Sequence, residues 1–387
     1  MMKKVCFLVD SIFSFGGVQR VTAVISKELS KEFCVTIATF DAPSSEDTTL
    51  YELNEANVQF QFLDNPKISE IKRKCCKVYS YLYRKWLPQT KFTSNLYNLS
   101  SFPSEKRNAL TTALKAGNYD VIVGVHAPLA VRLASCKRQL KGAKLLGWIH
   151  NSHEALFAKD SPYHLGPELL RHYEIQLQKL DTIIVLSNDD ASKYHIPTKV
   201  VYNPLTLTPG SPSTGTSKKF LAVGRFSRRH KGFDLLIEAF HLFAQRNEDW
   251  TLDLVGEGIE EPLYREMISS YGLEDRITIH PFTNYIQKYY SEAQIYVLSS
   301  RWEGFGLVIV EAMAHGLPVI SSDLPTSKEI MEDYGIYFQN GNAEQLAQRM
   351  EEATHMNWQQ KSAEAFRIAQ NFDVRNIIEQ WKTLINE

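Results

Sequence analysis

Short apolar runs alternate with helix-like segments in two successive series along this chain of 387 residues. The runs are short and rich in β-branched residues. Continuous apolar strands separated by helices predict a parallel sheet that helices cover on both faces. The two series therefore predict an α/β protein made of two doubly wound domains.

The predicted elements can be given by their bounds. Strands are expected at Val5–Val9, Val35–Thr39, Val58–Leu63, Val121–Val125, Lys144–Ile149 and Thr182–Leu186, and then at Phe220–Val223, Thr251–Val255, Ile277–His280, Ile295–Leu298 and Pro318–Ser321. Helices are expected at Val18–Ser30, Ser104–Ala116, Leu169–Gln178, Phe233–Gln245 and Glu260–Tyr271.

A change in composition marks the boundary between the two series. Residues 203–217 are rich in Pro, Gly, Ser and Thr, and cannot form a helix or a central strand. We therefore predict an N-terminal domain over 1–202, a linker over 203–217 and a C-terminal domain over 218–365. The spacing of apolar residues in Asn357–Ile385 predicts a helical end to the chain.

Composition excludes several classes of protein. A net charge of −1 argues against a nucleic-acid partner bound through bulk electrostatics. The five cysteines show no zinc-ligand spacing, which suits a reducing cytosol. No apolar stretch approaches the ~20 residues that span a bilayer. These features predict a cytoplasmic protein, with peripheral association on the inner face of the cell membrane as an open alternative.

Residues 303–311 read Glu-Gly-Phe-Gly-Leu-Val-Ile-Val-Glu and combine a strand end, a glycine loop and a helix start. The free N–H groups of such a loop and the positive end of the helix dipole favour a phosphate. Glu303 and Glu311 border that position and, as anions, suit hydroxyl groups instead. A site that binds a phosphate between two carboxylates, each accepting hydrogen bonds from hydroxyl groups, fits a nucleotide sugar, whose diphosphate lies between a ribose and a second sugar.

Four further motifs follow in a defined order: Gly16-Gly17 after the first strand, Gly224-Arg225, Lys231-Gly232 and Val255-Gly-Glu-Gly258. Together with the Glu-x7-Glu spacing they resemble the retaining glycosyltransferases of the GT-B fold, especially family 4, with its bacterial enzymes of cell-surface polysaccharide and glycolipid synthesis. The similarity is strongest over 203–332. The resemblance implies two Rossmann-like domains that face an interdomain cleft: 1–202 for the acceptor, 218–365 for the nucleotide-sugar donor, and a helix over 366–387 that crosses back.

The resemblance also implies roles for individual residues on the donor side. Arg225 and Lys231 would grip the diphosphate, Glu311 the ribose hydroxyls, and Glu303 would face the donor sugar. The remaining implied donor-binding residues are glycines and loop residues that bring backbone close to the ligand, or that line the nucleobase pocket: Gly16, Gly17, Gly224, Gly256, Phe282, Gly304, Phe305, Gly306, Leu307 and Val308.

Two of these donor-side assignments have alternatives. The basic stretch 225–231 could be a solvated loop, with Arg228, Arg229 and His230 left as surface residues. Phe282 could be a packed aromatic at a strand end.

Three histidines follow predicted strands of the first domain. Members of the resembled family place a histidine at the donor sugar; we expect His150 there, then His153, then His126, the last two as acceptor-side candidates. The predicted catalytic set is therefore Glu303, His150, Arg225 and Lys231. Because no Asp-x-Asp motif is present, we expect neither a metal nor another cofactor, with basic side chains neutralising the leaving diphosphate instead.

Residues 67–91 carry eight basic residues against one glutamate, a net charge of +7, with Tyr79, Tyr81, Tyr83 and Trp86 interleaved. Apolar residues recur there near helical spacing. A basic amphipathic helix with interfacial aromatics indicates an anionic membrane surface. A solvated helix packed on the first domain is the competing interpretation, and the sequence leaves both open.

The expected activity is transfer of a sugar, most often from a UDP-sugar in this family, to a hydroxyl acceptor with retention of anomeric configuration. A lipid-linked or surface glycan intermediate is the expected acceptor. Two alternatives remain: a nucleotide-sugar epimerase on the same fold, and a non-catalytic relative that stabilises a partner. The latter usually loses motif residues, yet Arg225, Lys231, Glu303 and Glu311 are all present.

Overall fold

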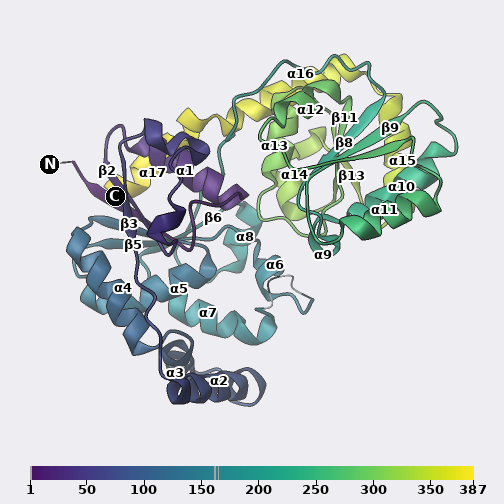
Figure 1. Ribbon diagram of the computed structural model, residues 1–387. Coiled ribbons are helices and arrows are strands. Elements are labelled where there is room, and N and C mark those ends of the chain that lie inside the picture. Colours follow the sequence, from purple (N-terminus) through teal and green to yellow (C-terminus); the bar gives the residue numbers. More distant parts are fainter. Residues whose placement is uncertain (1, 161–162, 164) are drawn as a thin grey trace. The chain divides into compact units, whose positions relative to one another are not determined.

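The computed structural model describes residues 2–160, 163 and 165–387. The chain divides into two compact units (Figure 1). Unit 1 comprises Met1–Tyr202 and Val374–Glu387, and unit 2 comprises Asn203–Asp373. None of the helices within the described ranges is both long and apolar enough to span a bilayer.

Unit 1 is built on a seven-stranded, fully parallel sheet with strand order β3-β2-β1-β4-β5-β6-β7. All six strands predicted for this half of the chain are present, and five of them are buried almost throughout; the sixth, at the edge of the sheet, is only partly buried. The seventh strand escaped prediction because it has three residues. The bounds are β1 Lys4–Val9, β2 Cys34–Thr39, β3 Val58–Phe62, β4 Val121–Val125, β5 Lys144–Trp148, β6 Thr182–Val185 and β7 Thr198–Val200.

The helices of unit 1 connect and cover these strands. The main core cluster lies between the sheet and α5, α7 and their neighbours. The bounds are α1 Gly17–Leu29, α2 Glu70–Lys85, α3 Lys91–Ser101, α4 Ser104–Gly117, α5 Ala127–Cys136, α6 His153–Phe157, α7 Leu170–Leu177 and α8 Asn188–Lys193.

Unit 2 repeats the same design with a six-stranded parallel sheet of order β10-β9-β8-β11-β12-β13. The predicted strands are again present, and only the three-residue β13 was not predicted. The strands are β8 Lys219–Val223, β9 Thr251–Val255, β10 Ile277–His280, β11 Ile295–Leu298, β12 Val319–Ser322 and β13 Ile336–Phe338. The helices are α9 Arg228–Lys231, α10 Phe233–Ala244, α11 Glu261–Ser270, α12 Gln287–Glu292, α13 Leu307–Ala314, α14 Pro325–Met331, α15 Ala343–Thr354 and α16 Trp358–Ala369.

The predicted linker over 203–217 lacks regular secondary structure but is not a free connector. The Gly210 N–H donates to the His315 Nε2 (3.0 Å), and the Ser213 N–H donates to the His315 carbonyl (3.0 Å). The Ser213 hydroxyl donates to the Ala293 carbonyl. These bonds make the segment part of unit 2. Composition correctly excluded helix and strand, but it did not reveal that the backbone polar groups find partners in unit 2.

The predicted terminal helix over 366–387 is wrong in its starting point. α16 ends at Ala369, a short 3₁₀ turn follows, and α17 covers Val374–Asn386. Residues from Val374 onward belong to unit 1, where Trp381 is fully buried with its ring 5.7 Å from Phe7 and 4.7 Å from Trp148. The helical period runs through both helices, so the sequence did not show the break between them.

Candidate functional site

Each sheet has one point at which the strand order reverses, and ligands of doubly wound folds bind beyond the carboxyl ends of the strands at that point. In unit 2 the reversal lies between β8 and β11, which are followed by Gly224-Arg225 and by the loop at 302–306. In unit 1 it lies between β1 and β4, which are followed by Gly16-Gly17 and by His126. Most of the residues singled out from the sequence therefore lie at these two positions.

The Lys231 side chain lies over Gly224, where a larger residue would displace it. A Cβ at Gly224 would be 3.1 Å from Cε of Lys231 and 3.2 Å from its Cδ. The Gly224 N–H donates to the Val255 carbonyl (3.0 Å), which fixes the turn after β8. Arg225 is exposed beside this turn, where its guanidinium is accessible to an anionic ligand.

Lys231 and Glu303 form an ion pair at the reversal point of unit 2. Lys231 Nζ lies 2.6 Å from Glu303 Oε1, and the Ser300 hydroxyl donates to the same oxygen (2.7 Å). The side chains are only 14% and 8% exposed. Burial acts to raise the pKa of Glu303, but the charges of Lys231 and His230 and the two hydrogen bonds outweigh it, so that the pKa is lowered from 4.5. The carboxylate is therefore ionised at neutral pH.

The basic loop over 225–231 is held in place by Asp234, which the sequence analysis did not identify. The Arg301 guanidinium donates to both carboxylate oxygens of Asp234 (2.9 and 3.0 Å), and Arg228 Nε donates to one of them (2.9 Å). The Arg228 side chain is 61% exposed, in agreement with its interpretation as a surface residue, and it also belongs to this carboxylate-centred cluster. The cluster ties α9 to the first turn of α10 and to the loop after β11.

The loop after β11 presents the N-terminus of α13. Gly306 adopts φ +90°, a left-handed conformation that favours glycine, and precedes the first helical residue, Leu307. No side chain caps this helix, and its first turn contains no acidic residue. The N–H groups of Leu307 and Val308 thus begin a helix end suited to an anion. The Phe305 side chain is buried against Phe372 (ring centroids 5.7 Å apart), so only its backbone can serve a ligand.

Glu311 lies in α13, is 2% exposed and is oriented by two residues that no motif revealed. The Tyr290 hydroxyl donates to Glu311 Oε2 (2.9 Å). The His315 ring stacks on Tyr290 (5.0 Å), and its Nδ1 bonds the Glu311 carbonyl (2.7 Å). Tyr290 comes from α12, so only the three-dimensional structure brings it to Glu311.

Gly256 and Phe282 follow β9 and β10 respectively. A Cβ at Gly256 would be 1.9 Å from the Gly224 carbonyl oxygen, so the glycine allows the ends of β8 and β9 to approach each other. The Phe282 side chain is 44% exposed. Phe282 is therefore not part of the core, and its prediction as a residue of the nucleobase pocket stays a prediction.

In unit 1, residues 10–16 form the loop that leads from β1 to α1. Asp41 Oδ2 accepts the N–H groups of Ile12 (2.8 Å) and Phe13 (3.2 Å). The Gly16 N–H donates to the Tyr51 hydroxyl (3.0 Å), which in turn donates to the Ser14 carbonyl (2.9 Å). Gly17 is the first residue of α1, which has no side-chain cap. The glycines carry a motif that the sequence shows, whereas Asp41 and Tyr51, which shape their loop, carry none.

The three candidate histidines occupy different environments. His126 precedes α5 at the reversal point, with backbone angles φ +73° and ψ +149°. Residues other than glycine rarely adopt this conformation, and those that do are concentrated at functional sites. The His150 ring lies 5.4 Å from that of His126 and 4.2 Å from the Trp148 ring. His153 packs between Phe157 and Tyr194, with centroids 5.0 and 5.2 Å away.

Burial lowers the pKa values of all three histidines, and that of His150 falls well below 6.5. Within the described part of the chain, His150 Nε2 is buried without a hydrogen-bond partner. The rings of His126 and His150 are therefore neutral at pH 7 and able to donate or accept hydrogen bonds.

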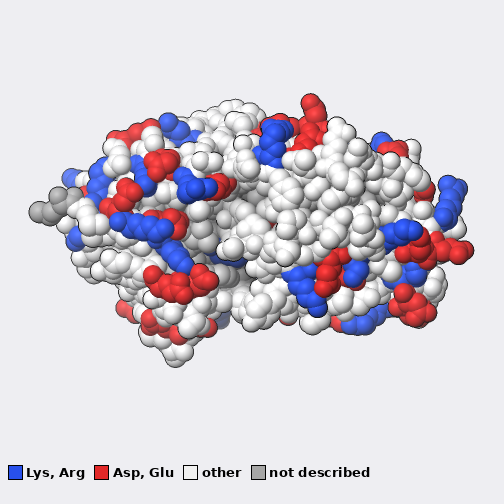
Figure 2. All heavy atoms as spheres, turned by 90° about the horizontal axis from the view of Figure 1, so that it is seen from above, with Lys and Arg blue, Asp and Glu red and all other residues white. Residues whose placement is uncertain are grey.

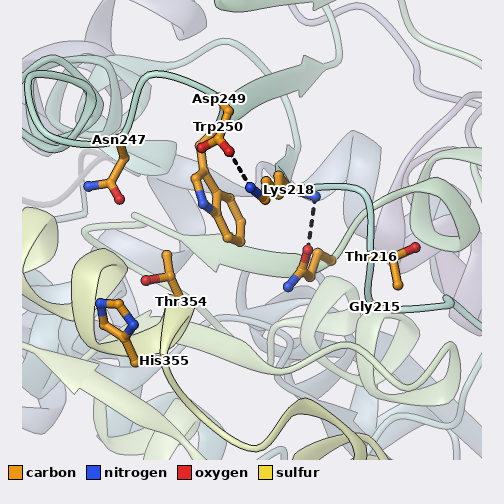
Figure 3. Close-up of a pocket in the computed structure, with 9 residues that line it drawn as sticks. Gly215, Thr216, Lys218, Asn247, Asp249, Trp250, Thr354 and His355 are labelled. Atoms are coloured by element: carbon orange, nitrogen blue, oxygen red, sulfur yellow. Dashed lines mark hydrogen bonds and ion pairs between the residues drawn. The ribbon is translucent and has the colours of Figure 1, made fainter.

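A cavity of about 370 Å³ lies elsewhere in unit 2 (Figure 3). It is at the amino-terminal ends of β8 and β9, beside Trp250, whereas the candidate site is at their carboxyl ends. Lys218 pairs there with Asp249, and its backbone N–H donates to Gln294 (2.8 Å). No predicted site residue lines this cavity. Among the residues that the structure describes, no three His, Cys, Asp or Glu side chains are grouped as a metal site would need.

Comparison with known proteins relates this chain to glycosyltransferases. Residues 208–370 match the family described as "Glycosyl transferases group 1". An uncharacterized glycosyltransferase of Haemophilus influenzae is 30% identical over 191 residues, which cover 48% of this chain and 54% of the relative. The GtfA subunit of a Streptococcus pneumoniae UDP-N-acetylglucosamine–peptide N-acetylglucosaminyltransferase is 26% identical over 264 residues, 62% of this chain and 52% of the relative. The chain thus spans about half the length of these two relatives.

A third relative aligns over most of both chains. The amylovoran biosynthesis glycosyltransferase AmsD of Erwinia amylovora is 25% identical over 350 residues, 86% of this chain and 85% of the relative. Among solved structures, Anabaena HepE with UDP and glucose has a TM-score of 0.75 at 21% identity, covering 99% of each chain. TarM has a TM-score of 0.77 at 16% identity, covering 100% and 99%. The fold is that of the GT-B glycosyltransferases, and the matches support the group 1 family.

Proposed function

We propose that this protein is a retaining glycosyltransferase that transfers a sugar from a UDP-sugar to a hydroxyl acceptor. The observation that carries the proposal is the arrangement in unit 2, where Lys231, Glu303 and the N-terminus of α13 meet at the reversal point of the sheet. A cation, a helix N-terminus and an ionised carboxylate suit a diphosphate attached to a hydroxyl-bearing sugar. Solved neighbours described with UDP and a sugar support the choice of donor.

The donor diphosphate would replace Glu303 as the partner of Lys231. Arg225 would add a second cation, and the Leu307 and Val308 N–H groups would hydrogen-bond the phosphate oxygens. Glu303, released from Lys231, would accept hydroxyl hydrogen bonds from the donor sugar, while Glu311 does the same for the ribose. Tyr290 keeps the Glu311 carboxylate fixed for that purpose.

Transfer would proceed on one face of the donor sugar. The bond between the anomeric carbon and the diphosphate oxygen breaks, the acceptor oxygen bonds that carbon, and the acceptor proton passes to the departing phosphate oxygen. The cations and helix amides stabilise negative charge that is greatest as this bond breaks, which accelerates the reaction rather than only tightening binding. In unit 1 we prefer neutral His126 as the group for a sugar hydroxyl, because it lies at the reversal point of the sheet, with the His150 ring 5.4 Å from its own. This preference reverses the order expected from the sequence.

Several details belong to the proposal alone. The acceptor would be a lipid-linked or surface glycan intermediate, in keeping with relatives named for polysaccharide biosynthesis. Membership of family 4 is proposed on the motifs, and a reaction without a divalent metal on the lack of an Asp-x-Asp motif in the sequence. A cytoplasmic location is proposed on the cysteine usage. Neither an epimerase nor a non-catalytic partner subunit is favoured by any specific contact.

The test is a donor-hydrolysis and transfer assay with a panel of UDP-, GDP- and ADP-sugars, followed by NMR of the product's anomeric proton. Enzymes of this kind are expected to release UDP slowly from the right donor even without acceptor, and to give a product with the donor's configuration. An inverted product would contradict the retaining mechanism. Interconversion of two UDP-sugars without release of UDP would establish an epimerase instead.

A further inference from the structure

Two antiparallel helices of unit 1, α2 and α3, leave apolar rows exposed. Figure 1 shows them as a pair at the edge of the unit, next to α7. On α2 the exposed row recurs at helical spacing, with Ile71 78% and Trp86 77% exposed. The exposed apolar residues of the pair are Ile71, Val78, Tyr81, Leu82 and Trp86 on α2 and its end, and Phe92, Leu96 and Leu99 on α3. We name these residues, with the lysines described below, the hairpin surface.

The opposite faces of both helices are anchored in unit 1. Tyr83 is buried, with its ring 4.5 Å from that of Tyr97, and the Tyr79 hydroxyl donates to the Thr93 carbonyl (3.1 Å). Lys72 pairs with Glu105 (2.6 Å) and Arg84 with Glu168 (2.6 Å). Each helix therefore has one apolar face that serves the core and a second that the described contacts leave uncovered. Exposed apolar surface of this extent in a monomer usually marks an interaction site.

The charge of the hairpin surface is almost entirely positive and largely unpaired. Arg73 pairs with Glu70 on the same helix. Within the described ranges, Lys67, Lys74, Lys77, Lys85 and Lys91 have no ion-pair partner, and all are exposed. The face of the molecule shown in Figure 2 differs, because basic and acidic side chains are interspersed there. The lysines thus remain available for an external anionic surface.

We infer that the hairpin surface docks this protein on an anionic lipid bilayer. Apolar and aromatic side chains would enter the boundary between headgroups and acyl chains, while the lysines reach the lipid phosphates with their stems along the apolar row. A symmetric pair of copies joined through the same surface would bring its unpaired lysines together, which disfavours a second copy as the occupant. The inference rests on these helices alone and goes beyond the proposed transfer reaction.

The experiment is flotation of the full-length protein with phosphatidylglycerol-rich and with pure phosphatidylcholine vesicles. Binding is expected to the anionic vesicles only, and to fall steeply between about 0.05 M and about 1 M salt, as the Debye length shortens to about 3 Å. Trp86 fluorescence should shift to the blue on binding, and the shift should vanish in W86F. Absence of binding at low salt, or equal binding to both vesicle types, would overturn the inference.

Matched variants separate the hairpin surface from general charge and hydrophobicity. K74S/K77S should lower partition into anionic vesicles by about tenfold or more. K115S/K141S, which removes two exposed unpaired lysines from elsewhere in unit 1, should leave it within about twofold. V78S/L82S should weaken binding, whereas I259S, at a 95% exposed site of unit 2, should not.

All of these positions are exposed, so thermal midpoints should be unchanged and loss of binding cannot be ascribed to unfolding. Equal loss in the test and control lysine pairs would refute the assignment to this surface. Sedimentation velocity tests whether a second copy of this chain covers the hairpin surface instead. If the wild type self-associates and V78S/L82S abolishes the association, the surface joins two copies and the lipid inference is overturned.

Discussion

Replacing Lys231 by methionine tests the buried ion pair at the centre of the candidate site. The substitution keeps the length of the side chain but leaves Glu303 8% exposed without its cation. Breaking a buried pair in this way costs about 3–5 kcal/mol. We expect the lower end, about 3 kcal/mol at pH 8, because the Ser300 hydroxyl bond to Glu303 remains.

The cost should depend on pH in a defined direction. In the wild type the pKa of Glu303 is lowered from 4.5, so the pair contributes stability above pH 4.5 and loses it as the pH falls through the folded value. In K231M burial is no longer opposed by the lysine, and the pKa of Glu303 should rise above 4.5. The variant can then relieve its penalty by protonating Glu303. The difference between wild type and K231M should therefore be largest at pH 7–8 and shrink toward about pH 4.5.

Differential scanning calorimetry at several pH values is the assay, since it can separate the transitions of the two units. A loss of about 3 kcal/mol corresponds to a fall of about 6–12 °C for a unit of this size. K231M/E303Q should recover most of the loss, because a neutral partner removes the unpaired charge. K218M, which breaks the exposed pair with Asp249, is the control and should cost less than about 1 kcal/mol. A K231M effect as small as that of K218M, a pH-independent effect, or no recovery in the double variant would refute the reasoning.

Three further outcomes are expected. R225A should lower turnover by about 10²-fold with an unchanged thermal midpoint, measured by UDP release; near-normal turnover would remove Arg225 from the diphosphate site. Y290F should raise KM for a UDP-sugar more than for its 2′-deoxyuridine analogue, because a loosened Glu311 loses its hold on the ribose; an equal effect on both donors would limit Tyr290 to a structural role. Activity should persist in excess EDTA, and loss that manganese restores would contradict the proposed metal independence.

Those parts of the fold that depend on the local pattern of one segment could be predicted from the sequence. Continuous apolar runs marked most of the longer strands, since both faces of the sheet centres are covered, whereas the edge strands β3 and β10 alternate with polar residues and β7 and β13 are too short to show a pattern. The stretch 203–217 shows the limit of composition. Its Pro and Gly content excluded regular structure, but its bonds to His315 and Ala293 depend on residues about a hundred positions away.

The candidate site was predictable where residues follow a strand and unpredictable where one side chain positions another. Gly224, Lys231 and Glu303 were singled out because they lie in loops or short segments after strands, and Glu311 because of its spacing from Glu303. Asp234, Arg301 and Tyr290 carry no motif: only the packing of α10 and the loop after β11 joins Asp234 to Arg301, and only the packing of α12 brings Tyr290 to Glu311. The preference for His126 over His150 stays a proposal: both residues follow strands, and the preference rests on the position of His126 after β4, beside β1 in the sheet.

Calorimetric titration with UDP in the presence of EDTA tests the central claim, that the reversal point of unit 2 is a nucleoside diphosphate site. The wild type should bind one UDP per chain. K231M and E311Q should bind between about 10-fold and 100-fold more weakly, the loss expected for one hydrogen bond to a charged group. Lys218 lies at the amino-terminal end of β8, whereas the candidate site lies beyond its carboxyl end, so K218M should bind UDP as the wild type does. Absence of UDP binding in the wild type, or undiminished affinity in both K231M and E311Q, would contradict the account.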